Sequence, residues 1–185
     1  MALLAALWLP ILLSAIIVFI ASSIMHTVLT YHQSDYRKLP DEDTVLAALR
    51  SAALTRGLYN FPHCTHKEMK TPAVQEKFKQ GPVGLLTIFP TGPLNMPKFL
   101  IQWFIYCALI SISAAYIAGH IILPGAPFRH VLRVVGAVAF MAYGLGTLSN
   151  AIWKGQTWSM TLKEVFDGLV YALLTAGTFA WLWPR

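Results

Sequence analysis

The chain has 185 residues and a mean hydropathy of +0.57; 56% of the residues are hydrophobic and 12% are charged. Soluble domains carry about 25% charged residues, so this composition excludes an ordinary water-soluble domain. The net charge of +6 does not indicate nucleic acid as a partner, because the basic residues are spread along one long segment. An anionic lipid surface or an acidic partner fits that distribution better.

Four apolar stretches are long enough to cross a bilayer, whose hydrocarbon core is about 30 Å thick and takes about 20 helical residues. They predict transmembrane helices at approximately 3–29, 99–123, 131–151 and 160–183. The first stretch carries no Lys or Arg before it and is about twice as long as a signal-peptide apolar region, so we expect a retained span. The fold class predicted is an all-α integral membrane protein that forms a single membrane domain over 1–185.

The segment 30–98 between the first two spans is predicted to fold into a partly helical cytoplasmic cap. A helix is expected at 41–56, because acidic residues from Asp41 precede apolar residues at helical spacing and Gly57 follows. A second helix is expected at 71–80, with Thr71 as N-cap, Pro72 in the first turn and Gly81 as the stop.

Two further pieces of the cap have no helical pattern. Tyr59-Asn60-Phe61-Pro62 is interpreted as a turn between the two helices. The apolar run 83–89 is too short to span a membrane and is expected to lie at the membrane interface or against the helix bundle.

Lysine and arginine residues are concentrated on one side of the predicted spans. The positive-inside rule therefore places segment 30–98 in the cytoplasm and both termini on the outer, periplasmic side. Nine of the fourteen lie in that segment: Arg37, Lys38, Arg50, Arg56, Lys67, Lys70, Lys77, Lys79 and Lys98.

Small residues recur at every fourth position in three of the spans. Helices in lipid associate where small side chains let their backbones approach, so these stripes are interpreted as packing seams, either between the spans or against another protein. The stripes are Ser111, Ala115 and Gly119 in the second span, Ala142, Gly146 and Asn150 in the third, and Gly168, Ala172, Ala176 and Ala180 in the fourth.

The most specific metal-ligand pattern is His63-Cys64-Thr65-His66 in the cap. Imidazole and thiolate ligands suit zinc, copper or iron, and His26 and His32 are expected on the same side of the membrane. A second pair of ligands at C-x-x-C or H-x-x-H spacing is missing from the sequence. The alternatives are hydrogen bonding within the loop or at the headgroup boundary, and proton handling.

A histidine inside a span is what a membrane haem or pigment requires. His120 lies near the outer end of the second span and is the candidate single ligand. His26 lies near the opposite face of the membrane, so the two histidines are not predicted to ligate one haem.

A transporter requires polar residues near the middle of the membrane, and Asp167 is the strongest candidate. Lys163 lies four residues earlier on the same helical face and is positioned to pair with it. The alternative is that Lys163, Glu164 and Asp167 form the solvated or headgroup-level first turns of the last helix.

Hydrolase, metalloprotease, nucleotide-binding and dinucleotide-binding motifs are absent from the sequence. No catalytic residue is therefore predicted, and we do not expect an enzyme or a bound cofactor.

Several segments resemble a set of bacterial four-span membrane proteins to which no function has been assigned. The resemblance runs over most of the chain and implies a multi-pass protein of the bacterial inner membrane. The segments are Tyr59-Asn60-Phe61-Pro62-His63-Cys64-Thr65-His66-Lys67, Gly81-Pro82-Val83-Gly84, Ile152-Trp153-Lys154-Gly155-Gln156-Thr157-Trp158, Asp167-Gly168-Leu169-Val170-Tyr171-Ala172 and Trp181-Leu182-Trp183-Pro184.

Together these features favour a non-catalytic accessory subunit that packs against a larger respiratory or photosynthetic membrane complex. Its expected partners are other integral membrane subunits and anionic lipid. The alternatives are a metal-, haem- or pigment-binding redox membrane protein and a small oligomeric transporter.

Overall fold

The structure is a computed structural model that describes residues 6–185 and divides into two compact units. The bundle unit contains the chain up to Asp35 and then Asn95–Ala151 and Gln156–Arg185. The loop unit contains Tyr36–Leu94 and Ile152–Gly155. The loop unit contains most of segment 30–98, which the sequence predicts as a cap within a single membrane domain.

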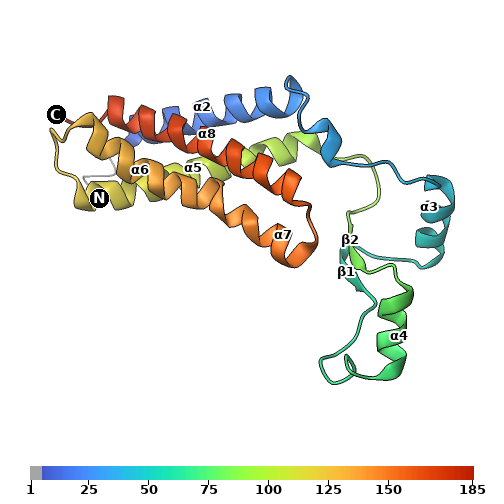
Figure 1. The fold of residues 1–185 in the computed structure, drawn as a ribbon. Coiled ribbons are helices and arrows are strands. Elements are labelled where there is room, and N and C mark those ends of the chain that lie inside the picture. Colours follow the sequence, from blue (N-terminus) through green and yellow to red (C-terminus); the bar gives the residue numbers. More distant parts are fainter. Residues whose placement is uncertain (1–5) are drawn as a thin grey trace. The chain divides into compact units, whose positions relative to one another are not determined.

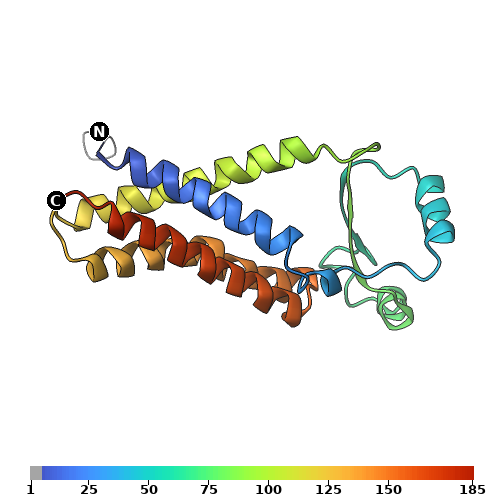
Figure 2. The same ribbon diagram turned by 90° about the horizontal axis from the view of Figure 1, so that it is seen from above.

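The bundle unit consists of long helices that run side by side (Figures 1 and 2). Residues 3–5 of the first predicted span lie outside the described residues. The start of α2 and the end of α8 lie at the same end of the bundle (Figure 1). The elements are α2 (Trp8–Thr27), η1 (Gln33–Asp35), α5 (Met96–Ile121), α6 (Phe128–Tyr143), η2 (Leu145–Thr147), α7 (Leu148–Lys154) and α8 (Trp158–Trp181).

Within residues 6–185, three helical segments are long and apolar enough to cross a membrane: α2, α5 and the stretch Phe128–Lys154. The third was predicted as one continuous helix, but after Tyr143 the regular helix gives way to η2 and resumes as α7. Gly144 and Gly146 lie at this break, where glycine is a poor helix former. Helix α8 has 24 residues, and Lys163, Glu164 and Asp167 lower its hydropathy.

The closest helix pair, α6 and α8, packs through small residues. A Cβ atom added to Gly168 would lie 2.5 Å from the backbone nitrogen of Gly144, so the two backbones touch where they cross. A Cβ atom added to Gly136 would lie 3.4 Å from the Cβ atom of Ala176. This is the close approach that small residues permit between helices in lipid.

The predicted small-residue stripes have different outcomes. Every member of the α8 stripe is buried, and in the α5 stripe Ser111 and Ala115 are buried and Gly119 is half-buried, so these two seams lie inside the bundle. In the third span Ala142 and Gly146 are exposed and Asn150 is half-buried, so this stripe is not a seam between helices of the described bundle, and its packing against another protein stays a prediction. The buried face of α6 is formed instead by Val131, Val135, Ala139 and Tyr143.

Polar contacts join the helices in the apolar interior and at the end where the chain stops. Ser14 of α2 donates to Ser111 of α5 at 2.9 Å, and both are fully buried. The Trp183 indole donates to the carbonyl oxygen of Leu123 at 3.1 Å, and the Gly125 amide donates to that of Pro184 at 2.8 Å. These bonds hold the end of the chain against the α5–α6 connection.

The loop unit contains α3 (Glu42–Ser51), β1 (Gly57–Phe61), α4 (Pro72–Gln80) and β2 (Gly84–Ile88). The strands pair antiparallel, with Gly57 opposite Ile88 and Phe61 opposite Gly84. The expected turn at 59–62 is therefore largely strand, and the apolar run 83–89 supplies the second strand. This sheet also corrects the all-α prediction.

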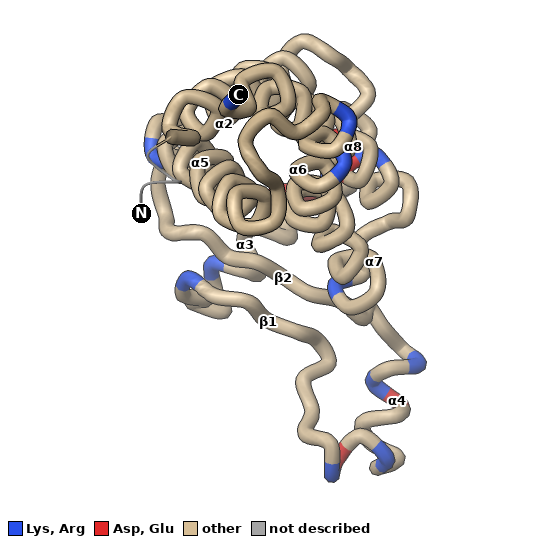
Figure 3. Tube along the Cα trace, turned by 90° about the vertical axis from the view of Figure 1, so that its left-hand side faces the viewer, with Lys and Arg blue, Asp and Glu red and all other residues tan. Residues whose placement is uncertain are grey.

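Helix α4 begins behind Thr71 and ends at Gly81, which matches the sequence pattern. Helix α3 is shorter than predicted and ends at Ser51, shortly before Ala53 adopts a positive φ of 49°. Residues 36–94, all of them described, include no buried residue. Charged residues recur along α4 and are sparse along the bundle helices (Figure 3).

Candidate functional site

Six polar side chains meet at the end of the bundle where the chain leaves α2. His26 lies in the last turn of α2, and three residues come from the short segment that follows it. Lys163 and Asp167 come from the first half of α8. We call this group the polar cluster: His26, Tyr31, His32, Asp35, Lys163 and Asp167.

Asp167 lies at the centre of the polar cluster and is only 3% exposed. One carboxylate oxygen accepts a hydrogen bond from the Tyr31 hydroxyl. The other lies 2.8 Å from Nε2 of His32 and 3.9 Å from Nε2 of His26. Asp167 is therefore not a solvated residue of the first turns of α8, because the segment after α2 folds over this part of the helix.

Lys163 does not pair with Asp167 as its spacing predicts. Its ammonium group lies 2.6 Å from Oδ1 of Asp35 and donates to the Tyr31 carbonyl at 2.6 Å and to Ser34 Oγ at 3.0 Å. Asp35 offers Lys163 an almost buried carboxylate, 3% exposed, whereas Asp167 is already occupied by Tyr31 and His32.

His32 bridges the two carboxylates, with Nδ1 at 2.6 Å from Asp35 and Nε2 at 2.8 Å from Asp167. Burial disfavours its charged form, but the hydrogen bonds to Asp35 and Asp167 prevail and raise the pKa of His32. Burial likewise opposes ionisation of Asp35, yet the hydrogen bonds with Lys163 and His32 lower the pKa of that carboxyl. With His32 charged, the two cations and the two carboxylates balance.

Three of these residues present metal-ligand atoms to one another. One donor atom each from His26, His32 and Asp167 lies within 4.8 Å of the other two. The Nδ1 atom of His26 lies 3.1 Å from the Ser22 carbonyl oxygen, and that of His32 contacts Asp35. A hydrogen bond donated by Nδ1 leaves Nε2 as the metal-ligating nitrogen, which is the usual arrangement of metal-binding histidines, and at His32 a metal ion would replace the proton that Nε2 donates to Asp167.

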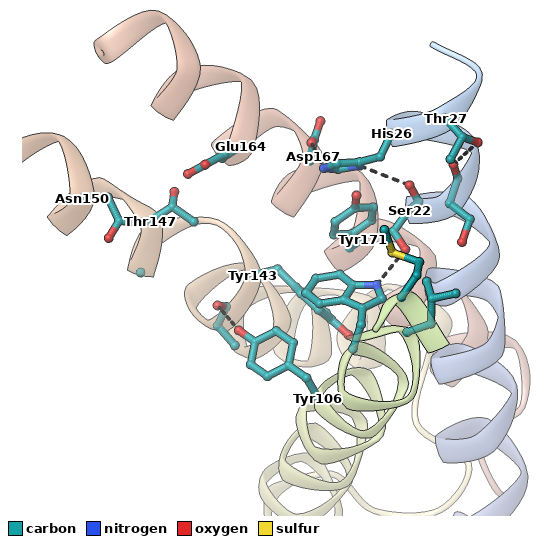
Figure 4. A pocket seen from close by; sticks show the side chains of 16 residues that line it. Ser22, His26, Thr27, Tyr106, Tyr143, Thr147, Asn150, Glu164, Asp167 and Tyr171 are labelled. Atoms are coloured by element: carbon teal, nitrogen blue, oxygen red, sulfur yellow. Dashed lines mark hydrogen bonds and ion pairs between the residues drawn. The ribbon is translucent and has the colours of Figure 1, made fainter. Parts of the chain in front are cut away.

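A cavity of about 800 Å³ adjoins the polar cluster inside the bundle unit (Figure 4). His26 and Asp167 belong to its lining as well as to the cluster. Its walls come from α2, α5, α8 and the α6–η2–α7 stretch. Aromatic and aliphatic side chains form one part of the wall: Met96, Leu100, Trp103, Tyr106, Tyr143 and Tyr171.

Several buried polar atoms in the cavity wall have no hydrogen-bond partner within the described chain. They are the hydroxyl of Tyr171, one carboxylate oxygen of Glu164 and the hydroxyl of Tyr143, which lies beside the Cys107 thiol, a weak hydrogen-bond partner. Tyr143 is 6% exposed and Tyr171 is 4% exposed. Buried polar groups are nearly always satisfied, so these atoms mark the cavity as a place where a ligand or water would bind.

The residues that the sequence singled out as ligands lie elsewhere. His63, Cys64 and His66 belong to the loop unit, between β1 and α4, where both histidines are exposed and Cys64 is half-buried. Among residues 6–185 the group whose ligand atoms converge is the one containing Asp167, and those three are not part of it. His120 is exposed in the last turn of α5, with Nδ1 2.7 Å from the Tyr116 carbonyl oxygen.

Sequence reasoning placed His26 and His32 on one side of the membrane but did not connect them with Asp167, which is 135 residues from His32. The available signal was a run of polar residues directly after the first apolar stretch, together with an aspartate inside the last one. No protein-family model, curated protein or solved structure matches this chain.

Proposed function

We propose that this chain is a four-span membrane protein that binds a divalent transition-metal ion through His26, His32 and Asp167. Helix α8, with 24 residues, is about 36 Å long at 1.5 Å per residue, which is enough for a fourth span. Its Asp167 is buried within the bundle. The start of α2 and the end of α8 lie at one end of the bundle, as an even number of crossings requires (Figure 1).

With four spans, the positive-inside rule puts the basic loop unit in the cytoplasm and both termini in the periplasm of a bacterial inner membrane. The polar cluster then lies at the cytoplasmic end of the bundle, because it adjoins the start of the loop unit in the chain. A metal ion would reach the site from that side.

The proposal rests mainly on the convergence of three metal-ligand atoms, from His26, His32 and Asp167. In both histidines the other ring nitrogen makes a hydrogen bond that orients the ring. The donor separations of 2.8 Å and 3.9 Å bracket the spacing of about 3.4 Å that tetrahedral ligands have at bond lengths of about 2.1 Å. Asp35 would act as the outer carboxylate that orients His32, and Lys163 holds Asp35 in place.

Two imidazoles and one carboxylate suit zinc, iron, manganese or cobalt in the divalent state. Three protein ligands leave at least one coordination position for water or another ligand, as in metal sites that do chemistry. His26 and Asp167 also line the cavity, so that position would face it.

The test is metal binding by protein in lipid nanodiscs after treatment with a chelator. We expect one Zn²⁺ per chain, and a Co²⁺ spectrum of a nitrogen- and oxygen-ligated site. His26→Ala should weaken Zn²⁺ binding at least about tenfold, because it removes one of the three ligands, a side chain that is 54% exposed.

His120→Ala is the matched control, because it removes an exposed histidine with the same bond to the carbonyl four residues earlier. Its Zn²⁺ affinity should equal that of the unmodified chain. Absence of bound metal, or equal effects of the two variants, would refute the metal site. Loss of binding in His63→Ala/His66→Ala instead would move the site to the loop unit.

A second candidate function is that of an accessory subunit of a larger membrane complex, and the surface of the loop unit supports it. This unit has no buried residue and exposes large apolar side chains, including Leu58 at 64% and Phe89 at 58%. Surfaces of this kind are typical of segments covered by a partner subunit or by a membrane surface. Gentle solubilisation followed by native mass spectrometry tests this: a co-purifying membrane subunit supports the proposal, and a lone chain contradicts it.

A further inference from the structure

We infer that the cavity beside the polar cluster binds a neutral amphipathic ring compound with oxygen substituents, of the quinone or phenol class, whose ring lies against Trp103 and Tyr171. This inference concerns the cavity itself and does not require a metal ion. It rests on the size of the cavity, its aromatic wall and the unpartnered hydroxyl group of Tyr171 in that wall.

The aromatic wall is a continuous series of four rings. Neighbouring ring centroids are 5.4 Å apart for Trp103 and Tyr106 and 6.3 Å apart for Trp103 and Tyr171. Tyr143 completes the series at 5.6 Å from Tyr171 and 6.0 Å from Tyr106. Flat aromatic faces pack well against another planar ring, and a cavity of about 800 Å³ accommodates a ring with part of an apolar tail.

In the cavity wall, the Tyr171 hydroxyl is a hydrogen-bond donor that has no acceptor in the described structure. Its side chain is 4% exposed and, in the described structure, this oxygen has no hydrogen-bond partner. Other hydroxyls in the lining already donate to backbone carbonyls, Ser23 at 2.8 Å and Thr147 at 2.8 Å. A carbonyl or phenol oxygen on a ring ligand that reached this hydroxyl would accept from it, whereas a lipid acyl chain has no atom that can do so.

The charge of the lining excludes an anionic ligand. Glu164 and Asp167 line the cavity, and its lining residues include no lysine or arginine. Asp167 is already paired with His32, so a phosphate or an acidic headgroup would meet the Glu164 carboxylate with no lysine or arginine in the lining to balance it. The lining combines these polar groups with apolar residues such as Met96 and Leu100, which matches a neutral amphiphile.

The experiment measures binding of decyl-ubiquinone to chelator-treated protein in nanodiscs, corrected for partitioning into empty nanodiscs. We expect saturable binding of one molecule per chain. Leu100→Trp fills the cavity and should weaken binding at least tenfold. Tyr171→Phe keeps the ring and removes only the hydroxyl, and should weaken it about fivefold.

Leu109→Trp is the matched control on the same helix. Leu109 is 56% exposed and is not part of the cavity lining, so this variant should bind like the unmodified chain. Equal binding by the two tryptophan variants would overturn the inference. Equally effective competition by 1-decanol, which has the tail without the ring, would overturn it in favour of an acyl-chain site.

Because the protein in this experiment carries no metal, its result is separate from the metal proposal. Quinone binding without Zn²⁺ binding would refute only the metal site. Zn²⁺ binding without quinone binding would refute only the ring-binding cavity.

Discussion

The bundle unit and the loop unit use apolar residues in opposite ways. In the bundle unit, Val131, Val135 and Phe179 are completely buried. In the loop unit, Leu58 and Phe89 are more than half exposed, and no residue between 36 and 94 is buried. The bundle unit therefore has a packed interior of its own, and the loop unit does not.

The loop unit is held together by local hydrogen bonds instead. The Asp41 carboxylate caps α3 by accepting from the Thr44 amide at 3.4 Å. Glu68 accepts from the amide and hydroxyl of Thr65 at 2.9 Å and 2.7 Å, and these bonds lower the pKa of its carboxyl. An isolated two-stranded sheet is at best marginally stable, so we expect the loop unit to open more easily than the bundle.

The largest effect should come from the closest helix contact. Gly168→Ala places a methyl group against the backbone of Gly144, which cannot move without separating α6 from α8. We expect the free energy of unfolding to fall by about 3 kcal/mol, and the yield of folded protein to fall with it. Thermal unfolding in nanodiscs, followed by tryptophan fluorescence, measures this.

Gly177→Ala on the same helix is the control, because its added Cβ would meet no atom within 4 Å. It should leave the unfolding temperature unchanged or raise it slightly, since alanine favours helix. Equal destabilisation by the two variants would show that α6 and α8 do not approach at Gly168, and the contrast between the two units would weaken.

Much of the fold follows from local patterns in the sequence. The long apolar stretches correspond to α2, α5, α6 and α8, and Thr71, Pro72 and Gly81 mark both ends of α4. The sheet could not be predicted from such patterns, because β1 and β2 are short and are separated by 22 residues that include a helix. Pairing at that distance depends on tertiary structure that no local pattern reports.

The candidate site was harder to predict for the same reason. The His63–His66 pattern is compact in the sequence but exposed in the structure, whereas the ligand atoms of His32 and Asp167 meet only through the fold. The pairing of Lys163 with Asp167 was predicted from helical spacing alone. The fold turns Asp167 inward toward His32 and brings Asp35 to Lys163 instead.

The next largest effect should come from the ion pair that ties the segment after α2 to α8. Lys163→Met leaves the Asp35 carboxylate, 3% exposed, without its cation. We expect a loss of about 2 kcal/mol of unfolding free energy, below the range for fully buried pairs because Lys163 is 23% exposed. Lys98→Met, at an exposed position, should have no measurable effect.

A double variant separates the ion pair from simple packing. Asp35→Asn combined with Lys163→Met removes both charges and keeps an oxygen near His32, so it should be less destabilising than the sum of the single variants. Additive losses would mean that Lys163 and Asp35 act independently. In that case the pair does not hold the polar cluster in place.

The smallest effect is expected in the loop unit. Leu58 lies on β1 opposite Thr87 and is 64% exposed, so Leu58→Ser removes almost no buried apolar surface. The unfolding free energy of the detergent-free protein in nanodiscs should change by no more than about 0.5 kcal/mol. A loss as large as that of Lys163→Met would show that Leu58 is covered when the protein is in a membrane. The exposed apolar residues of the loop unit would then form a contact surface. Both units would cover their apolar residues, the bundle unit with its own helices and the loop unit with the membrane or a partner.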